Sequence, residues 1–192
     1  MQERYWGKVL NKEMKDNDMN QIIIVKTKDN SKAILELYKG KHKVFETNAF
    51  IGKNGCTVNK KEGDCKTPLG IYNLGIAFGM HKPLKDLRVG YIQINNDLYW
   101  VDDVKSKYYN KLVDISKVNK DWNSAEHLIE YPKQYEYAIE IKTNPNNLPG
   151  QGSAIFLHCS MGRPTAGCIA IPKEKMLELL KSIGENVLIR IE

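Results

Sequence analysis

GSAIFLHCSMGRPTAGCIAIP, residues 152–172, is the stretch that decides the fold. An apolar run, Ala154–His158, ends in a histidine and is followed by a polar loop. The chain then reaches Gly167 and enters a second apolar run, Cys168–Ile171. Short apolar runs bounded by glycine and proline are typical of buried strands. We therefore predict two neighbouring strands that present an imidazole and a thiol on either side of one loop.

Similar runs extend this pattern toward both ends of the chain. Turn signals separate three of them near the N-terminus, which predicts an antiparallel meander over Gln21–Lys26, Lys32–Tyr38 and Lys43–Thr47. The polar triplet at 95–97 predicts a hairpin between the runs at 91–95 and 98–101. Further strands are expected at Gly70–Leu74, Glu136–Lys142 and Val187–Ile191.

Alternation marks the run Glu136–Lys142 as a strand with two different faces. Tyr137, Ile139 and Ile141 alternate with charged residues and Ala138. A period of two with one apolar face predicts a strand that is buried on one side and solvated on the other.

Helical structure is expected in three places. Pro172 precedes Lys173–Ser182, whose apolar residues form a stripe that ends before Gly184, so a helix is predicted there. Residues 1–20 predict an N-terminal helical segment, and Asp102–Tyr135 predicts a loop-rich insertion with some helix. We therefore expect a mainly β fold of mixed or antiparallel sheets with a few short helices, over a domain of residues 21–192.

The composition indicates which classes of partner the protein can bind. The chain has 192 residues, with 29 Lys plus Arg against 23 Asp plus Glu and a net charge of +6, which favours anionic partners. The lysines are scattered and no nucleic-acid motif accompanies them, so we expect no nucleic-acid partner. Since no apolar run reaches about 18 residues and the N-terminus lacks an apolar core, we expect no transmembrane helix and no signal peptide in this chain. We expect a monomer.

The imidazole and the thiol indicate nucleophilic catalysis. A thiolate is the attacking species, and a neighbouring imidazole takes the proton of the thiol, so His158 and Cys168 suit the roles of base and nucleophile. Gly167 lets a substrate backbone approach closely and leaves N–H groups free to face a developing oxyanion. We also expect Cys168 to have a low pKa and to react with thiol reagents faster than Cys56, Cys65 and Cys159.

Two other interpretations remain open at this point. Cysteine is often buried for structural reasons, so Cys168 and His158 could be a core thiol and an ordinary strand-end histidine. A zinc site formed by His158, Cys159 and Cys168 would need a bulge, because adjacent strand residues point to opposite faces. We expect no metal, and we expect Cys159 to point into the core. Cys56 and Cys65 could form a disulfide or stay free.

The same stretch resembles the catalytic motif of the L,D-transpeptidase family, also called YkuD-type or ErfK/YbiS-type. The motif has a strand ending in His, a variable loop, then Ser or Thr, one residue, Gly and Cys, and here it reads His158 followed by Thr165-Ala166-Gly167-Cys168. A second match is the Asp-x-x-Thr-Pro-x-Gly turn at residues 64–70. The resemblance covers roughly residues 21–172.

This resemblance implies a sandwich of mixed β-sheets and acyl transfer on peptidoglycan stem peptides, without a cofactor. Cys168 would attack an L,D peptide bond, release the terminal D-residue and form a thioester that an amine or water resolves. His158 would be the general base, Gly167 would shape the oxyanion site with the Cys168 N–H as donor, and Thr165 would supply a supporting hydrogen bond. The family also implies an extracytoplasmic location, in the periplasm or the cell wall.

The chain departs from the family pattern beside the cysteine. Ala166 and Ala170 occupy positions where many members carry His or Lys and Arg or Asn. Arg163 in the loop is our candidate for binding a substrate carboxylate in their place, because a guanidinium binds a carboxylate through two parallel hydrogen bonds. L,D-carboxypeptidase trimming and a non-catalytic wall-binding module are the alternatives to cross-linking.

Overall fold

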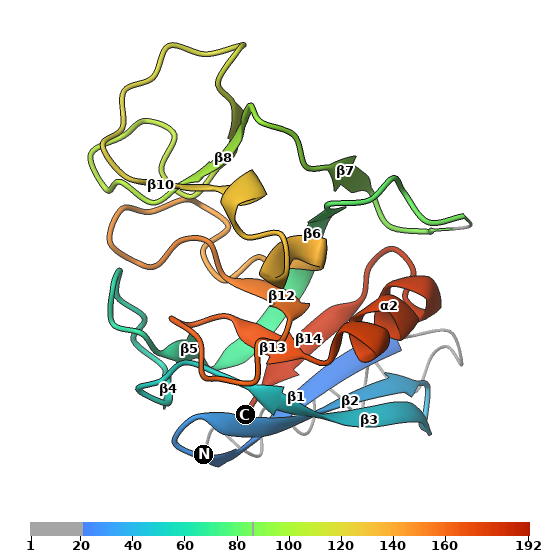
Figure 1. Ribbon diagram of the computed structural model, residues 1–192. Coiled ribbons are helices and arrows are strands. Elements are labelled where there is room, and N and C mark those ends of the chain that lie inside the picture. Colours follow the sequence, from blue (N-terminus) through green and yellow to red (C-terminus); the bar gives the residue numbers. More distant parts are fainter. Residues whose placement is uncertain (1–20, 86) are drawn as a thin grey trace.

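The architecture is mainly β, with mixed sheets, as predicted. The structure is a computed structural model that describes residues 21–85 and 87–192. The predicted N-terminal helical segment, residues 1–20, lies outside the described residues. Figure 1 shows the N-terminal meander at the bottom and the segment around residues 98–127 at the top.

The predicted meander forms the first three strands. These are β1 (Gln21–Asp29), β2 (Lys32–Lys39) and β3 (His42–Phe50), paired antiparallel in chain order. Alternate residues of these strands, such as Ile23 and Leu35, are fully buried, which is the reason for their apolar pattern.

One nine-stranded sheet dominates the fold and closes on itself. Its order is β11-β12-β13-β3-β2-β1-β14-β6-β7, and an additional antiparallel pairing of β6 with β11 joins its two halves. The β1–β14, β12–β13 and β6–β7 pairs are parallel, so the sheet is mixed. The remaining members are β6 (Gly70–Gly79), β7 (Tyr91–Gln93), β11 (Tyr137–Ile141), β12 (Phe156–Cys159), β13 (Ile169–Ile171) and β14 (Leu188–Ile191).

Both faces of this sheet are covered around β11 and β12. The inner face and α2 (Lys173–Ser182) enclose the larger core, which includes Leu157 and Ile169. The outer face carries a second core that includes Phe78, Ala138 and Phe156. Ala138 is fully buried in this second core, so the prediction of a solvated face for the 136–142 strand is wrong at Ala138, although Lys142 at its end is exposed. The covering layer comes from a distant part of the chain, which local alternation cannot reveal.

The covering layer consists of β8 and the insertion that follows it, residues 102–135. Strands β8 (Leu98–Val101), β9 (Leu112–Asp114) and β10 (Ala125–His127) form a small antiparallel sheet in the order β10-β8-β9. Two short 3₁₀ turns follow it, η1 (Leu128–Glu130) and η2 (Gln134–Glu136). The insertion therefore has more strand than predicted, and it packs its apolar side on the outer face of the main sheet.

The hairpin predicted around residues 95–97 does not form. A tight turn is present, with the Asp97 N–H donating to Asn95 Oδ1 at 2.9 Å. However, β7 pairs with β6 in the large sheet while β8 pairs with β9 and β10. The turn therefore passes the chain from one sheet to another.

The helix α2 begins and ends where the sequence predicts. Its apolar stripe buries Met176, Leu179 and Leu180, and the Ile183 N–H donates to the Leu179 carbonyl at its end. None of the helices in the described part of the chain is long and apolar enough to cross a membrane.

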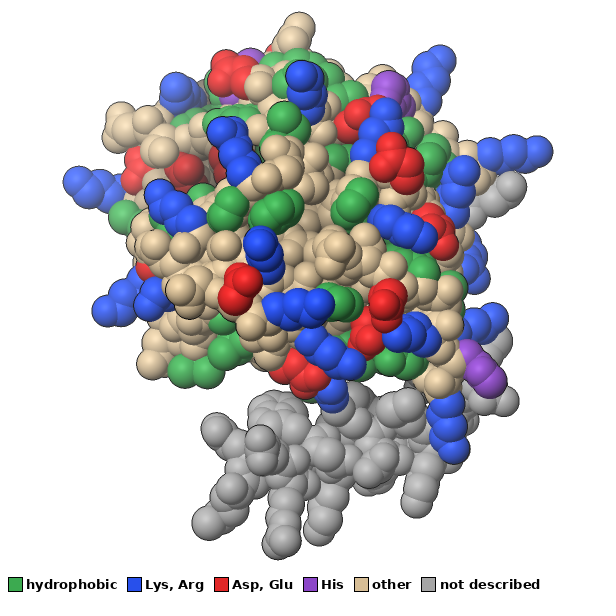
Figure 2. All heavy atoms as spheres, turned by 60° about the horizontal axis from the view of Figure 1, so that its bottom comes forward, with side chains coloured by type: hydrophobic (Ala, Val, Ile, Leu, Met, Phe, Trp, Pro, Cys, Tyr) green, Lys and Arg blue, Asp and Glu red, His purple; other side chains and the backbone are tan. Residues whose placement is uncertain are grey.

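Surface charge is mixed on the face shown in Figure 2. Lysine and arginine side chains are interspersed there with acidic ones and form no continuous basic stripe. On the meander, Glu36 pairs with both Lys26 and Lys43.

Two short strands, β4 (Cys56–Thr57) and β5 (Thr67–Pro68), pair in parallel beside the main sheet.

Candidate active site

Two adjacent parallel strands bring His158 and Cys168 to the same face of the sheet. In the register of β12 with β13, Leu157 lies opposite Ile169 and His158 lies opposite Ala170. Cys168 precedes Ile169, so its side chain points to the same side as that of His158. From the strand spacing and rise, the two Cα atoms are diagonal neighbours about 8 Å apart.

Both residues line one open cavity of about 400 Å³. His158, Cys168 and Ala170 form its floor. The loop between β12 and β13 forms one wall, which carries Arg163, Pro164 and Thr165 and is joined by Lys53. The insertion forms the other wall with Glu126, Tyr131, Gln134 and Tyr135.

His158 is held as a neutral base. Its Nδ1 is 2.9 Å from the Cys159 carbonyl oxygen, and since a carbonyl only accepts, Nδ1 carries the proton. This leaves the lone pair on Nε2. Burial lowers the pKa of His158, although the bond to the Cys159 carbonyl opposes the shift, so the imidazole is neutral at neutral pH. The ring of Tyr135 lies edge-on to the imidazole, with 5.7 Å between centroids.

The thiol of Cys168 is turned toward β12 in this resting arrangement. It donates to the Ala154 carbonyl at 3.2 Å, and Sγ accepts the Phe156 N–H at 3.3 Å. Burial, and secondly the charge of Glu126, raise the pKa of Cys168 to about 12. The expectation of an acidic thiol is therefore wrong for the resting site. The resting cavity therefore contains a neutral thiol and a neutral imidazole instead of a thiolate–imidazolium ion pair.

This arrangement predicts slow alkylation of Cys168. With a pKa raised to about 12, the Cys168 thiol is almost entirely protonated at pH 7.5. We expect iodoacetamide to label the half-exposed Cys65 before Cys168, and the Cys168 rate to rise about tenfold per pH unit up to pH 9. Peptide mapping by mass spectrometry measures both rates. Faster labelling of Cys168 than of Cys65 at pH 7.5 would show that a thiolate–imidazolium pair exists at rest.

A tight turn before Cys168 fixes the direction of its backbone N–H. Gly167 has φ +143°, and a Cβ atom there would lie 3.0 Å from the Lys66 carbonyl oxygen, so this position requires glycine. Thr165 Oγ1 accepts the Gly167 N–H at 3.1 Å and donates to the Cys168 carbonyl at 2.6 Å. Among the described residues, the Cys168 N–H makes no turn or loop hydrogen bond to another backbone group.

The second sequence motif, residues 64–70, supports this turn from below. The buried Thr67 hydroxyl accepts the Gly52 N–H and donates to the Gly167 carbonyl, each at 2.8 Å. Burial alone would raise the pKa of Asp64, but the Lys60 ammonium and two backbone N–H groups outweigh it and hold that pKa below its usual value. The motif is thus a structural support of the Gly167–Cys168 turn.

Replacing Thr67 tests this support. We expect Thr67→Val to lower the free energy of unfolding by about 2–4 kcal/mol, because it leaves the Gly52 N–H and the Gly167 carbonyl buried without partners. Urea denaturation measures the change. Thr57→Val is the matched control, since the Thr57 hydroxyl accepts only the nearby, exposed Asn59 N–H. Equal stability of the two variants would remove the proposed support.

Of the other residues considered in the sequence, Arg163 lies at the cavity and the three remaining cysteines lie away from it. Arg163 is exposed on the loop wall and lines the cavity, within reach of a ligand. Cys159 points into the inner core, and its thiol is 3.5 Å from the Tyr137 carbonyl, as expected. His158 and Cys159 thus face opposite sides of the sheet, which separates the ligands of the alternative zinc site. Cys56 and Cys65 are both free thiols.

Two residues of the insertion wall, Glu126 and Tyr135, were not predicted from the sequence. Tyr135 donates a hydrogen bond to Glu126 Oε2. Burial raises the pKa of Glu126 to about 7, and this carboxyl lines the cavity beside Cys168. No local pattern marks either residue, because their position depends on how the insertion packs on the main sheet.

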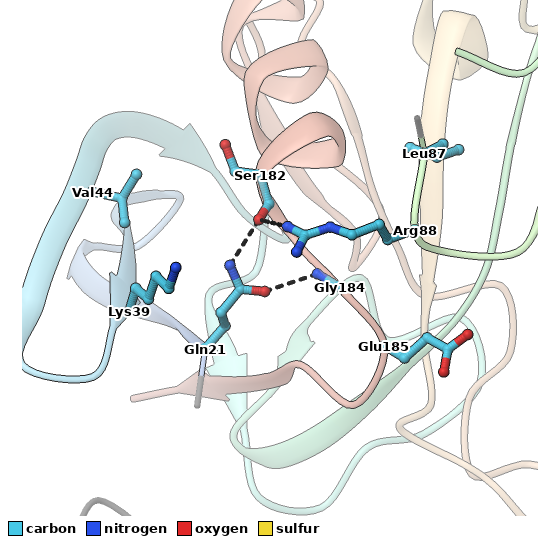
Figure 3. A pocket seen from close by; sticks show the side chains of 8 residues that line it. All are labelled: Gln21, Lys39, Val44, Leu87, Arg88, Ser182, Gly184 and Glu185. Atoms are coloured by element: carbon cyan, nitrogen blue, oxygen red, sulfur yellow. Dashed lines mark hydrogen bonds between the residues drawn. The ribbon is translucent and has the colours of Figure 1, made fainter. Parts of the chain in front are cut away.

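A larger cavity of about 780 Å³ lies elsewhere, between β1, the end of α2 and the loop before β7 (Figure 3). The side-chain amide of Gln21 donates to the Ser182 carbonyl and accepts the Gly184 N–H, and Arg88 also donates to Ser182. These groups cap the end of α2. The cavity contains no thiol or imidazole, so the reactive groups belong to the smaller one.

A family model described as L,D-transpeptidase catalytic domain, YkuD, matches residues 20–191. The chain belongs to this family. The match includes both sequence motifs and the whole of the cavity floor. Membership supports an L,D-transpeptidase-type enzyme.

Comparison with individual proteins adds one solved structure. The L,D-transpeptidase domain is similar to Mycobacterium tuberculosis L,D-transpeptidase 1, with 10% identity and a TM-score of 0.41. The alignment covers 90% of this chain and 61% of that one, so the chain spans less than two thirds of that structure. No curated protein matches the chain.

Proposed function

We propose that residues 21–192 form a cysteine acyltransferase domain that cross-links peptidoglycan stem peptides through a thioester on Cys168. One observation carries this proposal: Cys168 and the proton-accepting edge of His158 face the same open cavity from adjacent strands. A cysteine that only fills the core would not require an imidazole on the same face of the sheet.

Acylation begins when the thiol leaves the Ala154 carbonyl by rotation about its side-chain bond. His158 Nε2 takes its proton, and sulfur attacks the carbonyl carbon of the L,D peptide bond. The N–H of Cys168, directed by the Gly167 turn, stabilises the oxyanion, while Thr165 holds the turn in place. The imidazolium then protonates the leaving amine, and the terminal D-residue departs. Catalytic hydrogen bonds often form only when substrate is bound, so the resting thiol orientation is compatible with this order.

The walls of the cavity suit an anionic peptide end. Arg163 and Lys53 lie together on the loop wall, and in our proposal Arg163 binds the terminal carboxylate of the donor stem. In this proposal the partner is the peptidoglycan stem and not nucleic acid, and the interspersed surface charges support that choice. We further propose that the protein acts outside the cytoplasm, where the wall is, and acts as a monomer without metal or cofactor.

Incubation with purified tetrapeptide muropeptides tests the proposal. Mass spectrometry should detect release of the terminal D-residue together with cross-linked dimers. Release with tripeptides alone would assign the domain to L,D-carboxypeptidase trimming. Absence of any released residue would contradict an acyl-transfer enzyme and favour a wall-binding module.

A further inference from the structure

Glu126 is a carboxyl group without a cation on the insertion wall of the active-site cavity. None of the ion pairs in the described part of the chain includes it. Tyr135 occupies its Oε2, and among residues 21–85 and 87–192 no hydrogen bond reaches Oε1. Carboxylates removed from water are normally paired. The position of Glu126 in the cavity lining leaves room for the partner to be a ligand.

The surroundings of Glu126 add negative charge. Asp102 and Glu62 both act electrostatically on Glu126, and Asp102 Oδ1 is buried without a hydrogen-bond partner. The cations of the cavity, Lys53 and Arg163, come from other segments than the insertion that carries Glu126. The cavity that contains His158 and Cys168 is therefore lined by basic side chains and by one carboxyl group from the insertion, and this carboxyl group attracts a cation.

The position of Glu126 relative to the Cys168 sulfur indicates which cationic group binds to the Glu126 carboxylate. The charge of Glu126 is close enough to Cys168 to be the second cause of its raised pKa. An ammonium group bound at Glu126 would therefore lie beside the acyl carbon of a thioester on Cys168. The described residues contain no cluster of three His, Cys, Asp or Glu side chains suited to a metal ion, which favours an organic cation.

We propose that Glu126 binds the ammonium group of the acceptor and thereby favours amine over water in resolving the thioester. This inference rests on the proposed function, and it assigns the partition between cross-linking and trimming to one residue. Tyr135 is the positioning residue, since its hydroxyl holds one carboxylate oxygen and leaves the other for the ligand.

The proton balance of the step uses groups already in the cavity. The ammonium gives one proton to the Glu126 carboxylate, and the resulting amine attacks the thioester carbon. His158 Nε2 takes the second proton from nitrogen and returns it to sulfur as the carbon–sulfur bond breaks. Glu126 then releases its proton to solvent. A carboxyl pKa near 7 allows both uptake and release near neutral pH.

The test compares Glu126→Gln with the wild type in one reaction mixture. Both receive a tetrapeptide donor and a tripeptide stem that carries a free side-chain amine. The readout is the ratio of dimer to hydrolysed donor, which an equal loss of acylation leaves unchanged. We expect Glu126→Gln to lower this ratio about tenfold, the effect of one charge-assisted hydrogen bond. Glu130→Gln is the matched control, because Glu130 is exposed and lies four residues away, and its ratio should stay within about twofold.

A second nucleophile separates charge recognition from general damage. Hydroxylamine is uncharged near neutral pH, so its capture of the acyl group relative to water should be the same in Glu126→Gln and wild type. An unchanged dimer ratio, or an equal loss with hydroxylamine, would overturn the inference. A raised KM for the donor with an unchanged ratio would place the ammonium on the donor and would also overturn it. Failure of the wild type to release any terminal residue would instead remove the proposed function and this inference together.

Discussion

Replacement of Cys168 by alanine should lower the release of the terminal D-residue from a tetrapeptide stem at least about 10⁴-fold. Cys168 carries the one thiol among the described residues that line the cavity, and loss of the attacking atom removes the covalent route, leaving only binding and oxyanion stabilisation. Ala170, two residues further along the chain, also lines the cavity floor. Since an alanine side chain is already accommodated beside position 168, we expect the Cys168→Ala variant to fold normally. Chromatographic measurement of the free D-residue gives the rate.

The matched control is Cys65→Ala. Cys65 lies outside the cavity lining, and its thiol donates to the Gly63 carbonyl at 3.6 Å. Its replacement should leave the rate within about twofold. A Cys168→Ala protein that keeps more than about a tenth of the wild-type rate would show that another group attacks.

Replacement of His158 by glutamine should lower the same rate about 10³-fold. General-base catalysis contributes roughly 10²–10⁴-fold, and a thiol with a pKa of about 12 depends on its base more than an acidic thiol would. Glutamine can still donate to the Cys159 carbonyl, so the fold is expected to persist. Because the variant must wait for spontaneous thiol ionisation, its rate should rise with pH across the range from 7 to 9.

His127→Gln is the control for this variant. His127 lies on β10 stacked on Tyr99 at 4.2 Å, away from the cavity lining. A circular dichroism spectrum checks that both variants are folded. A His158→Gln rate within tenfold of the wild type would exclude the imidazole as the base.

Local sequence pattern was sufficient for most of the main sheet. The meander, the strands around His158 and Cys168 and the helix 173–182 all form where apolar period and turn residues predict them. These features depend on neighbours in the sequence. The predictions fail where packing against a distant segment determines burial or strand pairing. Ala138 is buried by the insertion, and the 95–97 turn joins two different sheets.

The same distinction holds for the candidate site. The pairing of His158 with Cys168 follows from two strands and one loop, which the sequence shows directly. The orientation of the thiol toward Ala154 and the wall formed by Glu126 and Tyr135 depend on contacts between segments far apart in the chain. For this reason the sequence predicted an acidic thiol, whereas the packed site desolvates it and places a carboxyl beside it.

A covalent intermediate on Cys168 is the most direct test of the central claim. The wild-type protein is mixed with a tetrapeptide donor, quenched in acid and measured as an intact mass, and the adduct is then located by peptide mapping. We predict an adduct equal to the donor without its terminal residue, attached to Cys168 and removed by hydroxylamine. Terminal-residue release without any adduct on Cys168, or with an adduct on another residue, would contradict the account.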